Sequence, residues 1–389
     1  MALHKLVTLE KAHELIEAST FKRPQVDVVP VYRAYWRISA SDIAARRSIP
    51  DRPLAAMDGY AVRIDDLRSY EWLRVAGEVK PGDDPPELRP GESYYVHMGA
   101  PVPIGAEAIS RVEATRVEGG YIKPLEPLKH GKDIIHVGEV VEEGSTVVRI
   151  GEVISPYKVT VLMMLGFTEI PVYKVRVGIL SVGDEIDPFD NPRGKPVVDS
   201  IAPMIMGLLR FTETTYLGVV ADNATEVRRV IEESIGGLDA LLTIGGASVG
   251  GADNVKRVLA EVGNLLFPGV SASILKRGGV AVVEERPVVT LPGQCVSAAL
   301  VLHEFFLHVL SRMVGGELRV YAEAELSEDL EVKHRMDTAY LFEVTGGKAK
   351  PLRWGVGLCM ELARATAYTV LKRGHYRVGD KLTLQKLIR

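Results

Sequence analysis

The 389-residue sequence predicts a multidomain protein in which a central α/β domain with a mostly parallel sheet is combined with β-rich parts. Three observations support this fold class. The chain is longer than one hydrophobic core normally serves. From Val175 onward, short apolar runs alternate with amphipathic helical segments, whereas Gly- and Pro-rich turns separate short strands before that point. After about Gly316, apolar residues recur with the period of two that is typical of strands.

The first predicted element is a helix near the N-terminus. Thr8 caps it, and four apolar side chains share one helical face: Leu9, Ala12, Leu15 and Ile16. The segment carries too many charges for a signal peptide. A second helix is predicted from Pro156 to Gly166. We expect the two helices to pack together in a small, discontinuous helical linker domain, residues 1–25 and 139–174.

The remaining domains follow from changes in texture along the chain. Residues 26–138 form a β-rich inserted domain, because turns such as GEVKPGDDPPELRPGE separate short strand-like runs. Residues 175–318 form the α/β domain, and residues 319–389 form a C-terminal β-barrel. In the α/β domain the loops SVGDE, TIGGASVGGAD and LPGQC follow predicted strands, at the edge where open α/β sheets bind ligands.

Composition excludes several classes of function. The net charge is −4 and there is no run of five or more Lys or Arg residues, so nucleic acid is not an expected partner. The longest apolar stretch, AALVLHEFFLHVL, is interrupted by His303, Glu304 and His308, which predicts a buried helix and no membrane partner. Few Asn and Gln residues suggest a thermophile source.

The two cysteines, Cys295 and Cys359, are too few for a disulfide framework and form no CxxC pair. A cytoplasmic location is therefore the default expectation. Cys295 stands beside a helix start, which can lower a thiol pKa, but no histidine is close in sequence. We expect it to be a packed residue and predict no nucleophilic catalysis.

A glycine-rich turn joins a strand to the helix that begins at Asn254. Gly245, Gly246 and Gly250 allow close approach of the backbone to a ligand, and the amides at the helix start favour an anion. A tight connection without a ligand is the alternative interpretation. Lys256 is either a phosphate ligand or an exposed helix residue.

Several acids accompany this turn. Asp184 and Glu185 follow a strand, where they are suited to hold a divalent cation or are simply solvated. Asp199, Asp222 and Asp253 occupy other strand or helix ends, although the last two are also natural helix N-caps. Carboxylates beside an anion cradle favour magnesium bridging to phosphate. The LPG turn, with Ser297 in the next helix, is explained locally as a turn and a cap.

One further acid, Asp58, stands within the apolar run PLAAMDGYAV. A carboxylate in an apolar setting is costly unless a cation or donor compensates it. An Asp-Gly turn with Tyr60 packed behind it is the alternative interpretation.

The stretches PLAAMDGYAV, GEVKPGD, GAPVPIGAEAI, GKDI, SVGDEI, DSI, GGASVGGAD, LPGQCVSA and GDKLTL occur in this order. In this respect the chain resembles the MoeA-type molybdopterin molybdenumtransferases, which are related to the gephyrin C-terminal domain. The resemblance implies a homodimer of four-domain subunits whose central domain is of the molybdopterin-binding type. It also implies insertion of molybdate or tungstate into adenylylated molybdopterin, with release of AMP and with Mg²⁺. The molybdopterin adenylyltransferase is an implied protein partner.

The resemblance also implies roles for individual residues. The MDGYA loop of one subunit is expected to face the α/β sheet edge of the other. The implied catalytic residues are Asp58, Asp133, Glu185, Asp222, Asp253 and Lys276. The implied metal ligands are Asp184, Glu185 and Asp58. The implied pterin or AMP ligands are Gly245, Gly246, Ser248, Gly250, Lys256, Asp199, Ser200, Pro292, Gly293 and Ser297.

The chain departs from the family pattern mainly in groups that would bind an anion. Met98 replaces the threonine of TGAP, DSN reads DSI, and LPGNP reads LPGQC with Gln294. Ala272 and Gly279 stand where the lysine-rich motif has lysines, so only Lys276 remains. Loss of these groups weakens anion binding. A catalytically impaired paralogue that acts as a pterin-binding or scaffold protein is therefore the competing hypothesis, and adenylylation of molybdopterin by the α/β domain is a third.

Overall fold

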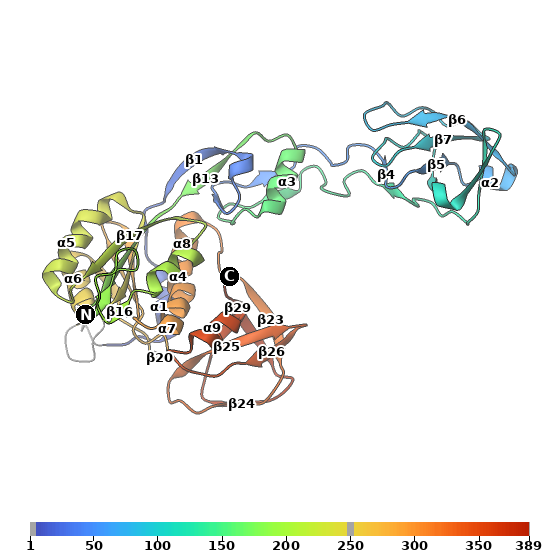
Figure 1. Ribbon diagram of the computed structural model, residues 1–389. Coiled ribbons are helices and arrows are strands. Elements are labelled where there is room, and N and C mark those ends of the chain that lie inside the picture. Colours follow the sequence, from blue (N-terminus) through green and yellow to red (C-terminus); the bar gives the residue numbers. More distant parts are fainter. Residues whose placement is uncertain (1–4, 247–252, 389) are drawn as a thin grey trace. The chain divides into compact units, whose positions relative to one another are not determined.

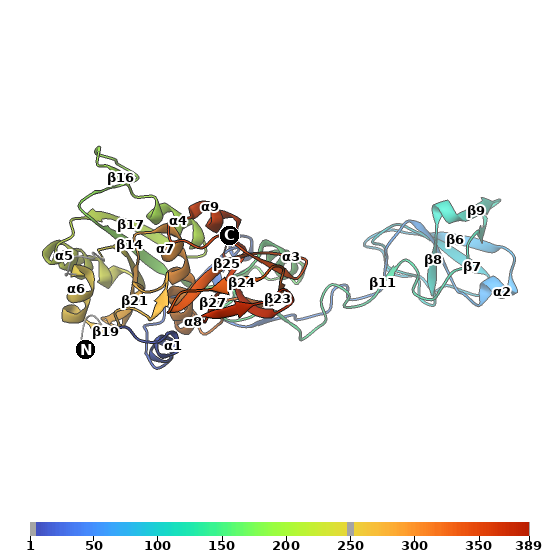
Figure 2. The same cartoon turned by 90° about the horizontal axis from the view of Figure 1, so that it is seen from below.

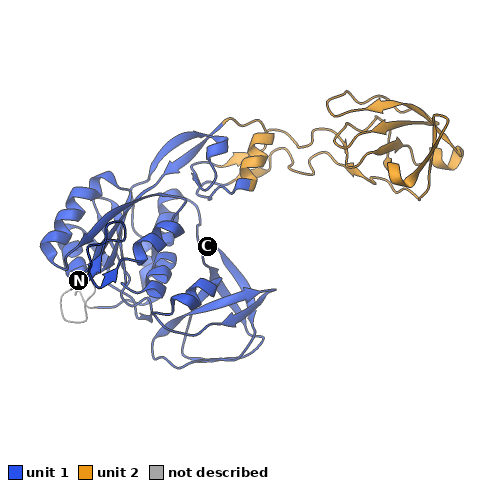
Figure 3. Cartoon of the chain, in the orientation of Figure 1, with its two compact units in different colours: residues 1–41, 149–156, 169–389 blue, residues 42–148, 157–168 orange. Residues whose placement is uncertain are grey.

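A computed structural model of the chain describes residues 5–246 and 253–388. The chain forms two compact units, which Figure 3 distinguishes by colour. The units comprise these residues: 1–41, 149–156 and 169–389 in unit 1, and 42–148 and 157–168 in unit 2. The predicted combination of an α/β domain with β-rich parts is confirmed. The finer division into four domains stays a prediction.

A six-stranded sheet forms the centre of unit 1. Its strands, in spatial order, are β17 (Glu213–Val220), β14 (Arg176–Val182), β18 (Ala240–Gly245), β22 (Arg286–Leu291), β21 (Gly279–Val283) and β19 (Asn264–Phe267). The first four are parallel to one another, β21 is antiparallel to β22, and β19 is antiparallel to β21. The prediction of a mostly parallel sheet is therefore confirmed.

Helices cover both faces of this sheet (Figures 1 and 2). One face packs against α4 (Ile201–Leu208), α7 (Cys295–Val301) and α8 (Leu307–Val314), and the other against α5 (Ala224–Ser234) and α6 (Asn254–Val262). Alternation along β14 explains this: Val177 and Ile179 join the first core, whereas Leu180 and Val182 join the second. Buried on both faces, the strand is a continuous apolar run.

The long apolar segment Cys295–Val314 is one continuous helix, in which the π-helical turn Leu302–Phe306 connects α7 to α8. It has the length and hydropathy of a membrane span, but 89% of its most apolar window is buried inside the protein. The prediction of a buried core helix is confirmed.

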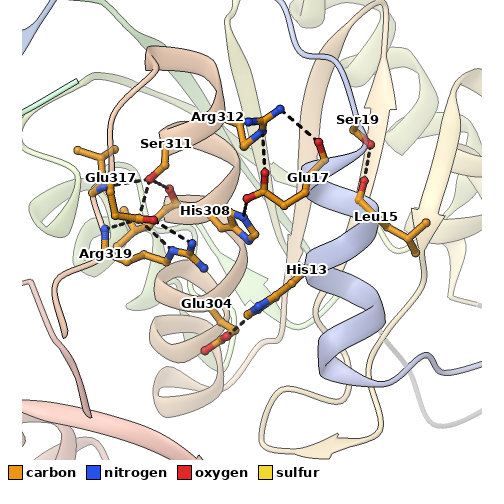
Figure 4. A network of polar contacts seen from close by, with 12 residues as sticks. His13, Leu15, Glu17, Ser19, Glu304, His308, Ser311, Arg312, Glu317 and Arg319 are labelled. Carbon is orange, nitrogen blue, oxygen red and sulfur yellow. Dashed lines mark hydrogen bonds and ion pairs between the residues drawn. The ribbon is translucent and has the colours of Figure 1, made fainter. Parts of the chain in front are cut away.

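Helix α1 (Leu9–Glu17) packs against β19 and α8. Thr8 caps it as predicted, accepting a hydrogen bond from the Lys11 amide at 3.1 Å. Ionisable groups line this contact (Figure 4): Glu17 accepts a hydrogen bond from His308 at 2.5 Å, and His13 lies 2.8 Å from Glu304. Burial lowers the pKa of His308. The sequence analysis expected this helix to pack against the helix at Pro156, and this was wrong, because its apolar face is covered by the α/β domain instead.

One small sheet joins the predicted linker domain to residues that the sequence analysis assigned to the inserted domain. Strands β1 (Gln25–Pro30), β13 (Glu169–Lys174) and β2 (Ile38–Ser39) make a three-stranded antiparallel sheet in unit 1. The purely helical description of 139–174 was therefore wrong at its C-terminal end, where β13 pairs residue by residue with β1. The helix predicted at Pro156 is present as α3 (Pro156–Met164), and Gly166 follows it with φ +81°.

The C-terminal part of unit 1 contains the predicted β-barrel. Five strands form its ring: β25 (Asp337–Thr345), β26 (Lys348–Pro351), β23 (Tyr321–Leu326), β29 (Lys381–Lys386) and β27 (Ala367–Leu371). Pairing of β25 with β27 closes the ring. The barrel is joined to the rest of unit 1 where β25 pairs with β20 (Ala272–Ser273) and where Tyr368 donates a hydrogen bond to Glu304 at 2.6 Å.

A disulfide also links these parts and corrects the sequence analysis. Cys295, the first residue of α7, is bonded to Cys359, the first residue of α9 (Cys359–Arg364), across 64 residues of sequence. The Cα atoms lie 6.0 Å apart, a normal separation for a disulfide. The expectation that Cys295 is simply a packed thiol was wrong, because its partner becomes its neighbour only when the barrel folds back on α7.

Unit 2 contains the predicted β-rich part. Its six-stranded sheet has the order β8 (Ala108–Arg111), β5 (Gly59–Val62), β7 (Glu92–Val96), β6 (Leu73–Val79), β10 (Tyr121–Pro124) and β9 (Thr115–Glu118). Two short pairs accompany it: β4 (Leu54–Ala55) with β11 (Ile134–Ile135), and β3 (Ile43–Ala44) with β12 (Thr146–Val148). The MDGYA segment therefore leads into the second strand of this sheet.

Candidate functional site

The loops singled out from the sequence meet at one edge of the α/β sheet. Val182, the last residue of β14, pairs with Val220 on one side and Gly245 on the other. Ile244 pairs with Leu291, the last residue of β22. Since these four parallel strands end at the same level, the turns that follow them lie side by side.

The turn after β18 requires glycine at two positions. Gly245 and Gly246 have φ values of +85° and +68°, which other residues rarely adopt. A Cβ atom on Gly245 would lie 2.5 Å from the carbonyl oxygen of Val182, and one on Gly246 would lie 2.5 Å from a methyl of Val255. The turn therefore brings bare backbone to the sheet edge. Ser248 and Gly250 lie outside the described residues.

A chain of hydrogen bonds ties three turns of this edge together. The Asp222 amide donates to Asp184 at 3.2 Å, and the side-chain amide of Asn254 donates to the carbonyl oxygen of Asp222 at 2.9 Å. Asn223 provides the cap of α5, accepting a hydrogen bond from Glu226, so the Asp222 carboxylate is not used as the cap. It instead accepts a second hydrogen bond from Asn254 at 3.2 Å.

Asp184 and Glu185 are both exposed at this edge. The loop that follows them is fixed by Asp187, which is buried and accepts hydrogen bonds from the amides of Arg193, Gly194 and Lys195. The sequence analysis did not single out Asp187. The result is a pair of solvent-facing carboxylates on a loop whose backbone is held in place.

Asp253 and Lys256 neutralise each other at the start of α6. Asp253 caps the helix by accepting a hydrogen bond from the Lys256 amide at 3.1 Å, and its other oxygen lies 2.6 Å from the Lys256 ammonium. Lys256 is only 7% exposed. Its charge is thus already balanced within the chain, and the pair fixes the start of α6.

Asp199 is buried and fully engaged. One carboxylate oxygen accepts hydrogen bonds from Ser181 at 2.5 Å and Tyr216 at 2.9 Å, and the other accepts one from the Ala202 amide at 3.0 Å. Burial and this carboxylate raise the pKa of Tyr216. Asp199 therefore braces the start of α4, and its neighbour Ser200 is exposed beside it.

Lys276 lies at the same edge, between β20 and β21, and is exposed. Because β21 is antiparallel to β22, with Gly279 opposite Thr290, its first residue starts where β22 ends. A Cβ atom on Gly279, where the family motif has its third lysine, would lie 2.9 Å from the Phe267 carbonyl oxygen, so the backbone of this chain leaves little room for a side chain there. Ile274 has φ +73°, a strained value for a β-branched residue and one found more often near functional sites.

The LPG turn completes the edge. Pro292 is buried, Gly293 is exposed, and Ser297 is buried within α7. A Cβ atom on Gly293 would lie 3.8 Å from the Cα atom of Gly245, so the two glycine turns lie next to each other. Together they form a backbone-lined surface next to exposed acids and one exposed lysine.

Asp58 occupies the start of β5 in unit 2. Its side chain is 56% exposed and accepts a hydrogen bond from the Met98 amide at 2.8 Å. His97 lies 3.9 Å from the same oxygen and is hydrogen-bonded to Glu78. The following glycine, Gly59, is required because a Cβ there would lie 2.3 Å from the Ser110 carbonyl oxygen. His97 and Glu78 were not singled out from the sequence.

Asp133 lies in the same unit but is engaged. Arg111 donates two hydrogen bonds to it, at 2.9 and 2.7 Å, and this contact holds the pKa of Asp133 below its ordinary value. Arg111 stands opposite Gly59 in the sheet. Asp133 therefore helps to anchor the segment that leads to Asp58.

Metal binding was tested against the donor atoms that the chain brings together. Within residues 5–246 and 253–388 no group of three or more His, Cys, Asp or Glu side chains is arranged to hold a metal ion. Asp184 and Glu185 are exposed and adjacent. Magnesium usually takes one or two protein carboxylates and completes its shell with water and substrate phosphate, so these two residues fit it.

Two family models match the chain. Residues 7–166 match the "MoeA N-terminal region (domain I and II)", and residues 178–312 match the "Probable molybdopterin binding domain". The molybdopterin molybdenumtransferase of Haemophilus influenzae is 31% identical over 80% of this chain and 78% of its own length. That of a Nostoc species is 26% identical over 92% and 88%. The crystal structure of the molybdopterin biosynthesis MoeA protein from Pyrococcus horikoshii matches 98% of this chain and all of its own, with 26% identity and a TM-score of 0.69.

Proposed function

The chain belongs to the molybdopterin molybdenumtransferase family, and we propose that the sheet edge of its α/β domain is where molybdate enters adenylylated molybdopterin. The chain is a transferase of molybdenum cofactor biosynthesis. The observation that supports the placement of the site is the meeting of two glycine turns, exposed acids and Lys276 at one level of the sheet.

Each group at the edge has a proposed task. The backbone at Gly245 and Gly293 receives the phosphate part of the adenylylated pterin, because neither glycine carries a side chain that would keep an anion from the backbone. Lys276 attracts the oxyanion. Asp253 and Lys256 act indirectly, since their charges compensate each other and fix the start of α6.

Mg²⁺ is proposed at Asp184 and Glu185. When bound, magnesium would neutralise phosphate charge and polarise the bond to the leaving AMP. The chain's own contribution is to hold both carboxylates outward on a braced loop, and to keep Asp222 oriented through Asn254. No covalent intermediate with a protein side chain is required, because catalysis consists of holding oxyanion and pterin together.

We propose that the enzyme is a cytoplasmic homodimer in which Asp58 of the partner subunit completes the site. Asp58 is half-exposed and held by a backbone amide, an arrangement that keeps its carboxylate presented to solvent. Met98, which lacks the threonine hydroxyl of the family, still provides that amide. Molybdate is the proposed oxyanion, with tungstate as the alternative. We also propose that the molybdopterin adenylyltransferase is a protein partner and that the source is a thermophile.

The scaffold alternative is not favoured. The curated relatives named above are enzymes by name. The sheet edge also keeps an exposed cation, Lys276, although the lysine at Gly279 is absent.

The test is incubation of the purified protein with adenylylated molybdopterin, magnesium and either molybdate or tungstate. We expect AMP release and metallated pterin. Glu185→Gln should remove both, whereas Glu232→Gln, which alters an exposed acid on α5, should leave both unchanged. Tight pterin binding without turnover would restore the scaffold alternative, and no binding at all would contradict both.

A further inference from the structure

The disulfide lies directly beside the proposed site. Cys295 follows Pro292, Gly293 and Gln294 without interruption, so the bond to Cys359 attaches the end of the LPG turn to α9. Helices α7 and α9 are in contact in the structure. Whatever moves α9 therefore acts on the turn that contacts Gly245.

Around the disulfide, the packing between the α/β domain and the barrel is incomplete. A mostly apolar cavity of about 600 Å³ separates α4, α7 and α9, and both cysteines line it together with Met204, Ala299 and Leu362. One backbone hydrogen bond, from the Val296 amide to the Val356 carbonyl oxygen at 3.3 Å, also joins the α/β domain to the barrel here. The covalent bond thus closes a contact that side-chain packing leaves open.

A reductant can reach this disulfide. Cys359 is exposed, and the next residue, Met360, is 75% exposed. Exposed disulfides are more easily reduced than buried ones and are more often regulatory. The rest of the barrel has other attachments, including the pairing of β20 with β25 and the bond from Tyr368 to Glu304. Reduction would therefore release α9 locally and leave the fold intact.

Cys295 also occupies a position where a different residue would give the same rigidity. The related motif LPGNP has proline there. Gln294 has φ −127° and ψ +133°, the conformation that a following proline favours, and Cys295 is the first residue of its helix, where proline is well tolerated. In this chain a disulfide, which can be reduced, replaces the permanent conformational constraint of a proline.

We propose that the Cys295–Cys359 disulfide is a reducible tether that positions the LPG turn for its anionic substrate, an inference that rests on the proposed function. A dithiol reductant supplies two electrons and two protons. The sulfur–sulfur bond breaks, each cysteine becomes a thiol, and the reductant becomes a disulfide. The oxidised enzyme holds the turn in its binding geometry, and the reduced enzyme binds the substrate's anionic groups more weakly.

Calorimetry with AMP and with molybdate tests this, on oxidised protein and on protein treated with dithiothreitol, well below the unfolding temperature. We expect reduction to weaken binding about tenfold. Cys359→Ser should bind as weakly as the reduced wild type and ignore the reductant. The double variant Cys295→Pro with Cys359→Ser should regain the oxidised affinity, because proline restores the constraint without a cross-link.

A disulfide that only adds stability would give a different result: a lower unfolding temperature on reduction with unchanged affinities, which would overturn the proposal. Two free thiols in aerobically purified protein would also overturn it. If no form binds AMP or molybdate, the proposed function fails. Hydrogen exchange then tests the proposed tether independently of ligand binding. Faster exchange of the amides of residues 294–297 on reduction would support the tether, and unchanged exchange would contradict it.

Discussion

The sheet edge of the α/β domain and the start of β5 in unit 2 organise their acids in different ways. At the sheet edge most of these contacts are made by the backbone: two glycine turns lie side by side, and the Asp222 amide donates a hydrogen bond to Asp184. In unit 2, side-chain ion pairs hold the strand ends, as Arg111 does for Asp133. Yet both regions contain an acid that forms an ion pair within its own chain, Asp253 or Asp133, and an acid that is exposed, Glu185 or Asp58.

This difference distinguishes acids that stabilise the fold from acids that are available for catalysis. Asp253 and Asp133 are neutralised by Lys256 and Arg111, so removing them should disturb local structure. Asp58 and Glu185 are exposed, so removing their charge should disturb catalysis alone. Substitutions at these two kinds of acid should therefore fail in different ways.

Asp58→Asn should have the largest effect on activity. We expect a loss of about a hundredfold or more, because a charge offered to a metal or a developing charge contributes several kcal/mol. Asparagine keeps the size of the side chain and can still accept the hydrogen bond from Met98. Unfolding temperature and oligomeric state should match the wild type, and AMP release measures the activity. Full activity in this variant would remove Asp58 from the chemistry.

Lys276→Ala should have a moderate effect. Removing the exposed cation at the sheet edge should raise the KM for molybdate about tenfold while changing kcat less, because one charge-assisted hydrogen bond to the oxyanion is lost. Arg377→Ala, an exposed cation on the barrel, is the matched control. An unchanged KM would mean that the oxyanion binds elsewhere.

Asp133→Asn should act on stability more than on catalysis. The paired hydrogen bonds with Arg111 would be weakened, with a cost of about 2 kcal/mol measured by denaturant unfolding. Activity at a temperature where the variant is folded should fall by less than about tenfold. A loss as large as that of Asp58→Asn, with unchanged stability, would break the division between the two acids.

The smallest effect concerns acid stability. Because the folded-state pKa of Asp133 is lowered, its contribution is present above its unfolded pKa of about 4 and is lost as pH falls through the folded value. Asp133→Asn should therefore make unfolding stability less dependent on pH below about 4 than in the wild type. An identical pH dependence in both proteins would show that Arg111 does not stabilise this carboxylate in the folded state.

Much of the fold could be predicted from the sequence because apolar periodicity reports directly on burial. The run VRVGILSV became β14 with both faces buried, and TIGG placed glycine where backbone contacts demand it. The docking of α1 on α8 could not be predicted, since its ion pairs join residues nearly 300 positions apart. The Cys295–Cys359 disulfide escaped prediction because the two cysteines, 64 residues apart in sequence, become neighbours only when the barrel folds back on α7.

The sequence predicted which residue types gather at the candidate site, but it did not predict which of them are buried and already paired. Sequence spacing cannot tell that Lys256 is buried against Asp253, or that Asp199 is fully occupied by Ser181 and Tyr216. Both were expected to face the pterin or AMP. Their partners come from neighbouring strands and helix ends, so only the folded sheet reveals which charges are already satisfied.

Whether the site is shared between subunits can be tested by mixing two inactive variants. Asp58→Asn and Glu185→Gln proteins would be combined, allowed to exchange subunits and assayed for AMP release. If the site is shared, each mixed dimer contains one site with both carboxylates, and about a quarter of the wild-type activity should return. If each chain builds its site alone, the mixture will stay as inactive as its two parents.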